Sequence, residues 1–271
     1  MTKMMHQTMP DRSLTTRKIQ HYGWRPDLPD ARDHLFAATG ETMRSMQAQV
    51  DLRPNCPPVY DQGQLGSCTG NAIAGAIQFE REKQGLTPDF VPSRLFIYYN
   101  ERVIEGTVSQ DSGAQIRDGI KAVAKQGAPP ETDWPYDINQ FAQKPPYQAY
   151  SDAMLDRAVT YKRVVQTATQ LKSCLAAGYP FVFGFTVYSS FESDQVANTG
   201  VVPMPNLQTE QVLGGHAVLA VGYDDSQQRF IVRNSWGPNW GMQGYFTIPY
   251  AYLTDSTLAS DFWTIQLVSH A

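Results

Sequence analysis

The chain has few cysteines, few histidines, no excess of basic charge and no long apolar run in its 271 residues. No apolar stretch approaches the roughly 20 residues that a membrane-spanning helix needs, so we expect no membrane partner. A formal net charge of −4 gives no basic surface for nucleic acid, and no nucleic-acid partner is expected. Three cysteines are too few for a disulfide-rich scaffold and suit a reducing compartment. Length and composition are those of a globular chain with room for one large domain or two lobes.

The first 48 residues differ in composition from the rest of the chain. Residues 1–10 are polar with scattered methionines, so no Sec signal peptide is expected. The cytoplasm is therefore the default location, and secretion by another route is left open. Residues 22–33 are rich in proline and charge without a helical or strand period, which predicts an extended segment. Its aromatic residues, Tyr22 and Trp24, indicate that this segment packs against another surface.

One cysteine has the sequence context of a nucleophile. Cys68 follows a glycine-rich turn and begins a predicted helix of small residues over 68–84. The positive end of the helix dipole favours a thiolate there, and such a presentation activates sulfur. Cys68 is therefore predicted to be catalytic. Cys56 and Cys174 have no such context and are interpreted as core thiols, with a disulfide between them left open.

A thiolate that attacks a carbonyl needs a basic partner and a group that orients this partner. Among the five histidines, only His216 lies in core-like sequence, where an apolar, glycine-bounded run predicts a buried strand over 217–223. A second predicted strand, 230–234, follows a hairpin turn and ends at Asn234. If the two strands pair, the Asn234 amide oxygen accepts from the imidazole and fixes its tautomer. Trp236 would shield that bond from water.

The same reaction needs donors for the oxyanion that develops on the attacked carbonyl. Gln62 stands six positions before Cys68 and would reach the oxyanion with its side-chain amide, joined by the backbone N–H of Cys68. Two glycines, Gly214 and Gly215, precede the histidine and leave room for a substrate backbone to pass close.

Helical patterns come first along the chain and strand patterns later. Further helices are predicted over 93–105, 114–126 and 171–177, and further strands over 160–165, 181–187, 245–248 and 262–268. Helices followed by strands favour an α+β protein of two lobes. In this arrangement Cys68 comes from the helical side and His216 from the sheet side of a cleft.

Three motifs in order give the chain a clear resemblance to the papain family of cysteine peptidases, as a bacterial-type member with a short N-terminal extension. They are Gln-Gly-x-x-Gly-Ser-Cys at 62–68, Gly-His-Ala at 215–217 and Asn-Ser-Trp-Gly-x-x-Trp-Gly-x-x-Gly-Tyr at 234–245. The resemblance covers roughly residues 49–271. It implies a papain-like two-lobe fold, with a helical lobe over about 58–158 and an antiparallel sheet or barrel over about 159–271. The active site lies in the cleft between them, and no cofactor or metal is implied.

The resemblance also implies roles for residues outside the three central motifs. Ser112 and Gly113 resemble the turn that holds the substrate backbone, and Trp240 resembles the residue that lines the leaving-group side of the groove. Gly184, Gly214 and Ile265 resemble the lining of the pocket for the substrate residue one before the residue at the cleaved bond. Small glycines and an apolar base predict a roomy hydrophobic pocket without charge selection.

The chain departs from the family pattern at the nucleophile and at the disulfides. Thr69 follows Cys68 where the family usually has an aromatic residue. Leu65 and Gln110 stand where papain has the two halves of one disulfide, and both halves are missing together.

The sequence therefore predicts a cysteine endopeptidase that acts on a polypeptide substrate through a Cys–His pair and a thioester. Another thiol acyl transfer, such as deamidation or transpeptidation, and a catalytically silent binding module on the same fold are the alternatives. Papain-like enzymes commonly carry an inhibitory pro-segment. We hypothesise that residues 1–48 are a pro-like segment that covers the cleft, with the peptidase domain over 49–271.

Overall fold

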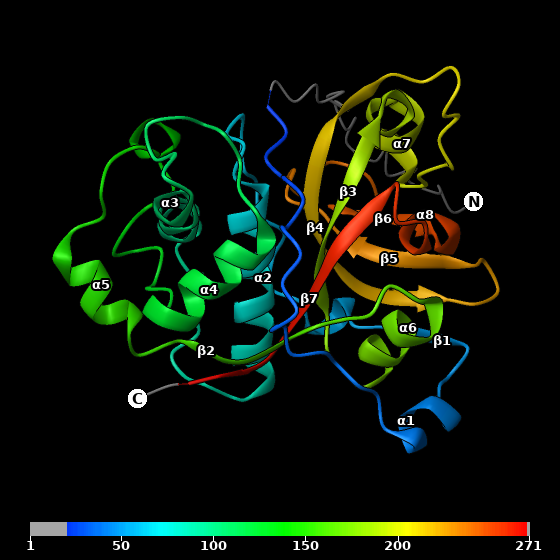
Figure 1. Ribbon diagram of the computed structural model, residues 1–271, viewed down its shortest axis with the longest axis horizontal. Helices are drawn as coiled ribbons and strands as arrows, with labels where there is room; N and C mark the ends of the chain where they lie inside the picture. The colour runs from blue at the N-terminus through cyan, green and yellow to red at the C-terminus, as the bar shows by residue number, and fades with distance from the viewer. Residues whose placement is uncertain (1–20, 270–271) are drawn as a thin grey trace, which may run out of the picture.

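A lobe of helices and a lobe built on one β-sheet lie side by side in the computed structural model, which describes residues 21–269 (Figure 1). The helical lobe contains α2 (Cys68–Lys83), α3 (Arg94–Glu105), α4 (Ile116–Gln126) and α5 (Tyr147–Ala153). Four other helices lie around the sheet: α1 (Gly40–Arg44), α6 (Ala168–Ala176), α7 (Asp194–Thr199) and α8 (Tyr250–Thr254). The predicted α+β fold of two lobes is confirmed.

The sheet is antiparallel in every strand pairing within the described residues. Its strands are β1 (Gln49–Asp51), β2 (Ala158–Arg163), β3 (Phe181–Tyr188), β4 (Val212–Asp224), β5 (Arg229–Arg233), β6 (Tyr245–Pro249) and β7 (Ala259–Val268). The strand order is β2-β7-β3-β4-β5-β6, and β1 pairs with the outer part of β4. The central strands β3 and β4 carry continuous apolar runs because both of their faces are buried.

Helix α2 forms the seam between the lobes. It packs against α3 on one side and against β4 and β7 on the other, and nearly all of its residues are buried. Small residues let the neighbours approach closely: a Cβ at Gly70 would lie 2.8 Å from the carbonyl oxygen of Arg94. The apolar, small-residue composition that predicted this helix therefore places its first residue, Cys68, against the sheet.

The long helices match the prediction to within two residues at each end. Ser93 caps α3 by accepting a hydrogen bond from the N–H of Phe96, and Gly106 ends it in the left-handed conformation. Strand β4 begins at Val212 rather than next to His216. Residues 212–215 pair with β3 although they are exposed or half-buried, so they show no apolar pattern that would predict a strand. Helices α1, α5, α7 and α8 were not predicted, since five to seven residues are too few to show a helical period.

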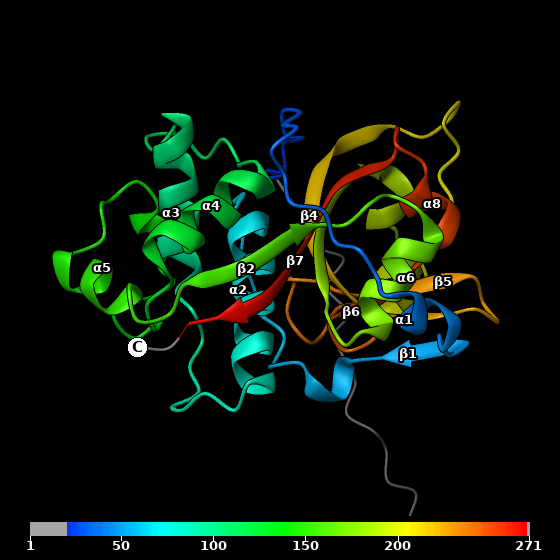
Figure 2. The same ribbon diagram turned by 60° about the horizontal axis from the view of Figure 1, so that its bottom comes forward.

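Residues 21–36, which we call the N-terminal strap, run down between the two lobes (Figures 1 and 2). One end bridges in parallel to the loop before α4, through Trp24 and Ala114. The other end bridges in parallel to β2, through Leu35 and Arg163. The strap therefore spans the seam on which Cys68 lies.

All three cysteines are free thiols in the described residues. The Sγ of Cys56 donates to the carbonyl of Leu52, and the Sγ of Cys174 donates to the carbonyl of Tyr179, each at 3.4 Å. The disulfide left open by the sequence is therefore not formed. None of the helices between residues 21 and 269 has the length and apolar character of a membrane span. Residues 1–10, where no signal peptide is expected, lie outside the described range.

Candidate active site

Cys68 is the first residue of α2 and meets β4 across the seam. Its side chain is fully buried, and Sγ accepts a hydrogen bond from the N–H of Ala217 at 3.4 Å. Ala217 directly follows His216 on β4. This contact joins residues 149 positions apart and places the sulfur beside the strand that carries His216.

The imidazole of His216 is held by an amide and enclosed by aromatic rings. Its Nε2 lies 2.9 Å from Oδ1 of Asn234, the residue that directly follows β5. Oδ1 of Asn234 also accepts from the N–H of Ser235 at 2.8 Å, which fixes the amide. The ring of Trp236 lies against the imidazole, with centroids 5.2 Å apart. Trp240 packs edge-on against Trp236 at 5.1 Å and so supports this aromatic wall.

Gln62 is buried, and its amide orientation is fixed by two contacts. Oε1 accepts from the hydroxyl of Ser235 at 2.6 Å, and Nε2 donates to the carbonyl of Leu65 at 2.9 Å. An amide nitrogen carries two hydrogens, so one N–H of Gln62 is left for a further acceptor. Ser235, which the sequence analysis gave no role, therefore decides which end of the Gln62 amide is a donor.

The turn before the nucleophile is tied to the loop before α4 by a carboxylate. Both oxygens of Asp111 accept from the N–H of Gly66, at 3.1 and 3.0 Å, and Oδ1 also accepts from the hydroxyl of Tyr98. These loops are the ones that the family resemblance would join by a disulfide through positions 65 and 110. Hydrogen bonds to Asp111 thus take the place of the missing disulfide.

The backbone of the strap crosses Cys68. Gly23 accepts from the N–H of Ala114 at 2.8 Å, and the N–H of Trp24 donates to the carbonyl of Gly215 at 2.8 Å. A Cβ on Gly23 would overlap the carbonyl of Gly66, so only glycine fits this close approach. Gly113 has a φ of +67°, and a Cβ there would meet Gly23 in turn.

Two aromatic side chains of the strap fill the space beside His216. The ring of Tyr22 lies edge-on to the imidazole, with centroids 6.0 Å apart, and packs on Gly214. The indole of Trp24 lies directly against Gly184 and Gly215, where any Cβ would overlap it. The glycines that the resemblance assigned to a substrate pocket therefore face strap side chains.

The two remaining residues predicted to contact substrate are Ile265 and Ser112. Ile265 belongs to the same apolar cluster as Trp24, and it is buried on β7. The hydroxyl of Ser112 donates within its own loop, to Oγ1 of Thr107 at 2.9 Å.

Burial raises the pKa of the Cys68 thiol to about 12, although backbone N–H groups of Ala217, Gly23 and Thr69 oppose this shift. The expectation of a thiolate at the helix N-terminus is wrong for this closed arrangement, because desolvation of the charged form outweighs the helix dipole. Gly23 is one of the groups that contact the sulfur. The strap therefore covers the nucleophile and contributes to the burial that raises its pKa, although the N–H of Gly23 itself lowers this pKa.

Two acidic residues that the sequence analysis missed, the buried Asp261 and the half-buried Asp27, lie beside the indole of Trp24. Asp261 on β7 accepts from Nε1 of Trp24 at 3.1 Å and from the N–H of Asp27 at 2.8 Å. Asp27 in turn accepts from Nε1 of Trp263 at 2.8 Å and from the N–H of Arg117 at 3.0 Å. Burial first and then the charge of Asp261 raise the pKa of Asp27 to about 6. Nothing in the local sequence of either aspartate indicates this pairing, since they are 234 positions apart.

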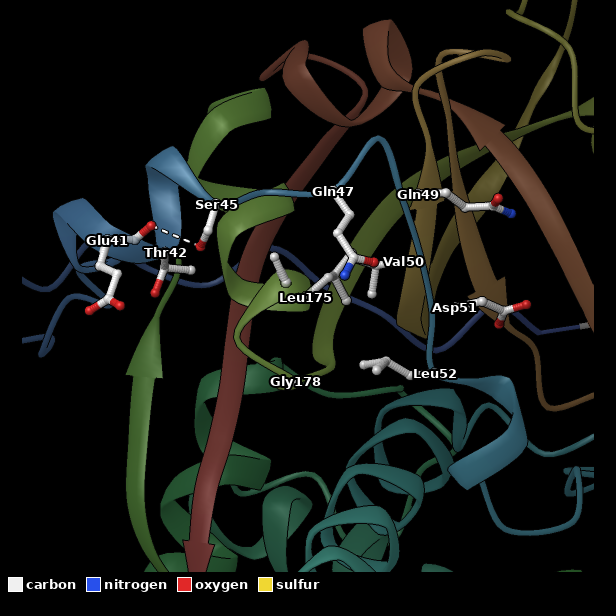
Figure 3. A pocket seen from close by; sticks show the side chains of 11 residues that line it. Glu41, Thr42, Ser45, Gln47, Gln49, Val50, Asp51, Leu52, Leu175 and Gly178 are labelled. Atoms are coloured by element: carbon white, nitrogen blue, oxygen red, sulfur yellow. Dashed lines mark hydrogen bonds between the residues drawn. The ribbon is translucent and has the colours of Figure 1, made fainter.

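A separate hollow of about 670 Å³ lies between α1, the segment through β1, and the end of α6 (Figure 3). Ser45 donates to the carbonyl of Glu41 at its rim, and the side chain of Gln47 points toward Leu175 inside it. The lining includes none of the predicted site residues, so this hollow is distinct from the seam at Cys68.

A two-lobe α+β fold that brings a helix-start cysteine to a histidine bonded to an asparagine defines the class of thiol-dependent peptidases. The chain matches the family model for papain family cysteine proteases over residues 46–262. It belongs to the papain family and is a cysteine protease.

Individual relatives agree with this assignment. A peptidase C1-like protein of Acanthamoeba polyphaga mimivirus is 43% identical over 279 residues, covering 94% of this chain and 89% of that protein. The crystal structure of xylellain, a cysteine protease from Xylella fastidiosa, is similar with a TM-score of 0.85 and 44% identity, covering 98% of this chain and 100% of that one. A cathepsin B-like protein of Giardia intestinalis is 30% identical, covering 80% of this chain and 74% of that protein.

Proposed function

We infer that the protein is an endopeptidase in which Cys68 forms a thioester with the acyl part of a cleaved peptide bond. The observation that carries this inference is the hydrogen bond from Ala217 to the Cys68 sulfur, directly beside the His216–Asn234 pair. The Cys68 thiolate attacks the carbonyl carbon, and His216 as imidazolium protonates the leaving amine. Neutral His216 then takes a proton from water, which hydrolyses the thioester and restores the thiol.

The neighbouring residues support these two steps. Asn234 accepts from Nε2 of His216 and so keeps the imidazole turned toward the sulfur, while Trp236 shields this bond from water. The second N–H of Gln62 and the backbone N–H of Cys68 donate to the oxyanion. Such donors act most strongly when they are fixed in advance, which is what Ser235 does for the Gln62 amide.

The strap marks where an extended peptide would bind. Ala114 and Gly215 hydrogen-bond to its backbone from opposite sides, and Gly113 leaves room for it. A substrate that uses these same groups competes with the strap. Trp240, at the edge of the aromatic wall, then lines the leaving-group side.

We assign residues 1–48 as a pro-like segment and residues 49–271 as the peptidase domain. The strap blocks Cys68 sterically and raises its pKa by burial, so the closed chain holds a protected thiol. Activity then requires that the strap is displaced or removed. Because two of its backbone groups and two of its aromatic side chains are docked, this segment inhibits as a competitor of substrate.

A labelling and cleavage experiment tests the function. The experiment uses a background that carries Gly23→Ala, in which the strap cannot dock. In this background an epoxide-type thiol inhibitor should label the protein at Cys68, and the same preparation should cleave fluorogenic peptides. Adding Cys68→Ala should abolish both signals, whereas adding Cys174→Ala, which changes another buried thiol, should retain both. Cleavage with Cys68→Ala at the rate of the Gly23→Ala background contradicts the assignment.

Product analysis separates hydrolysis from other acyl transfers at the same thiol. Mass spectrometry of a glutamine-containing peptide distinguishes two hydrolysis fragments from a deamidated peptide of unchanged length and from a ligated product. A product mixture without internal peptide-bond cleavage would replace the endopeptidase function by one of these transfers.

A further inference from the structure

A buried carboxylate closes the hollow into which the strap places its tryptophan. Asp261 is 2% exposed, and its Oδ2 lies 3.1 Å from Nε1 of the Trp24 indole. The walls are Gly184 on β3 and Gly215 on β4, which leave the space that the flat ring occupies. The sequence had predicted an apolar base for this hollow and no charged group in it.

The side chain that enters the hollow is determined by how the backbone of an extended segment is held beside it. The backbone of Trp24 is held by Gly215 on one side, and its neighbours Gly23 and Arg25 are held by Ala114 on the other. These three groups bind main chain and therefore do not discriminate between residues. A substrate bound through them directs one side chain between Gly184 and Gly215, as Trp24 does.

Removal of the strap leaves the acceptor oxygen of Asp261 without its donors. Both Nε1 of Trp24 and the N–H of Asp27 leave with the strap, and both donate to Oδ2. The other oxygen, Oδ1, keeps the guanidinium of Arg163 at 3.6 Å. A buried acceptor without a donor is unfavourable, so an incoming side chain that restores one is favoured over a similar side chain that cannot.

We propose that Asp261 is a specificity-determining residue that selects substrates with tryptophan one residue before the residue at the cleaved bond. The proposal rests on the peptidase function inferred above. The flat indole fits between Gly184 and Gly215, and its N–H can donate to Oδ2 of Asp261, the oxygen that loses its donors with the strap. Because Arg163 already balances the charge of Asp261, a neutral N–H donor fits better than a cationic side chain.

Paired peptides test the proposal in the full chain carrying Gly23→Ala, which prevents docking of the strap, together with Trp24→Ala, which removes the indole from the hollow. Two fluorogenic peptides that differ only by tryptophan or phenylalanine at this position are compared by kcat/KM. The ratio does not depend on how much of the protein is open, because both peptides meet the same open fraction. We expect the tryptophan peptide to be favoured by about tenfold or more. An arginine peptide is expected to fall below the tryptophan peptide.

Asp261→Gly removes the carboxylate and is compatible with the left-handed backbone of this residue, which has a φ of +61°. In this variant the tryptophan-to-phenylalanine ratio should fall to about one. The leucine-to-phenylalanine ratio, which involves no side-chain N–H, should stay unchanged and serves as the internal control. Cleavage without a tryptophan preference, or a preference that survives Asp261→Gly, overturns this proposal alone. Failure to cleave any peptide contradicts the peptidase function and this proposal together.

Discussion

The hydroxyl of Thr69 donates a hydrogen bond to Oε1 of Glu101 at 2.8 Å, and both residues are fully buried beneath the start of α2. Burial raises the pKa of Glu101 well above its usual range. The residue that departs from the family pattern after the nucleophile is thus bonded to a buried carboxyl group on α3. This bond couples the first turn of the catalytic helix to the helix behind it.

Thr69→Val should therefore destabilise the protein while Glu101→Gln should change little. Valine removes the donor and leaves a buried oxygen unsatisfied, which should lower the free energy of unfolding by about 1–3 kcal/mol. Glutamine keeps an acceptor of the same size, and Thr69→Ser keeps the donor as a matched control. Urea denaturation of the variants measures the difference. Equal stability of the valine and serine variants would show that the bond contributes nothing.

Gly23→Ala should expose the nucleophile. The added methyl group would overlap the carbonyl of Gly66, so the strap cannot dock, and the burial that raises the Cys68 pKa to about 12 is removed. Alkylation of Cys68 by iodoacetamide at pH 8 should then accelerate by more than about a hundredfold, because the thiolate fraction rises with each unit by which the pKa falls. Gly40→Ala is the matched control, since its Cβ would lie 3.4 Å from the Arg44 side chain without overlap. Equal alkylation rates in the two variants would show that the strap does not protect Cys68.

Ser235→Ala should lower turnover with little change in KM. The substitution leaves Oε1 of Gln62 without the donor that orients the amide, so the oxyanion donor is present but no longer fixed. We expect a loss of about tenfold in kcat, against roughly 10²–10³-fold for Gln62→Ala. Peptide hydrolysis is compared in one background that carries Gly23→Ala. The exposed Ser151→Ala on α5 is the control, and a loss confined to KM would assign Ser235 to substrate binding instead.

Docking of the strap should weaken as the pH rises from about 4 to about 6. The pKa of Asp27 is raised from 3.8 in the free chain to about 6 when docked, facing the charge of Asp261 and the donors of Arg117 and Trp263. The docked form therefore binds more protons between these values, so docking is strongest below pH 4 and reaches its weaker plateau above pH 6. The change corresponds to at most about a hundredfold in the docking equilibrium.

Hydrogen exchange measures this pH dependence through the Trp24 and Arg25 amides, which donate to Gly215 and Ala114. Their protection factors, corrected for intrinsic exchange, should fall between pH 4 and pH 6. Asp27→Asn should remove the slope, whereas Asp30→Asn, at a half-buried position of the same strap where the carboxylate pairs with Arg32, should keep it. A slope that persists in Asp27→Asn would assign the pH dependence to another group.

Local patterns were enough to predict the residues that surround the sulfur. Cys68 begins α2, Asn234 directly follows β5, and His216 lies within β4, as the fifth residue of that strand. The apolar pattern of these three elements was therefore enough to predict the residues, although the start of β4 was predicted too late. The path of the strap was predicted only as an extended, packed segment, because proline-rich sequence carries no period that fixes a partner. Its two aromatic residues were the signal that it docks.

Residues that act through a single long-range hydrogen bond were not predictable. Asp261 stands in an ordinary strand sequence, and its significance depends on a tryptophan 237 positions earlier. Asp111 directly precedes the predicted turn at Ser112 and Gly113, and nothing in that turn indicates its contact with Gly66, which lies 45 positions earlier. Such pairs are set by how the lobes assemble, and one sequence contains no periodicity that reveals them.

The N–H of Gly66 donates to the carboxylate of Asp111, so the turn before Cys68 is held in place by a contact that does not depend on redox conditions. A disulfide at this place would be reduced by the same thiols that keep Cys68 from oxidising, and its loss would loosen the turn. A carboxylate that accepts from a backbone N–H is indifferent to glutathione or dithiothreitol. Strong reductant therefore preserves the nucleophile at no cost to the geometry that presents it.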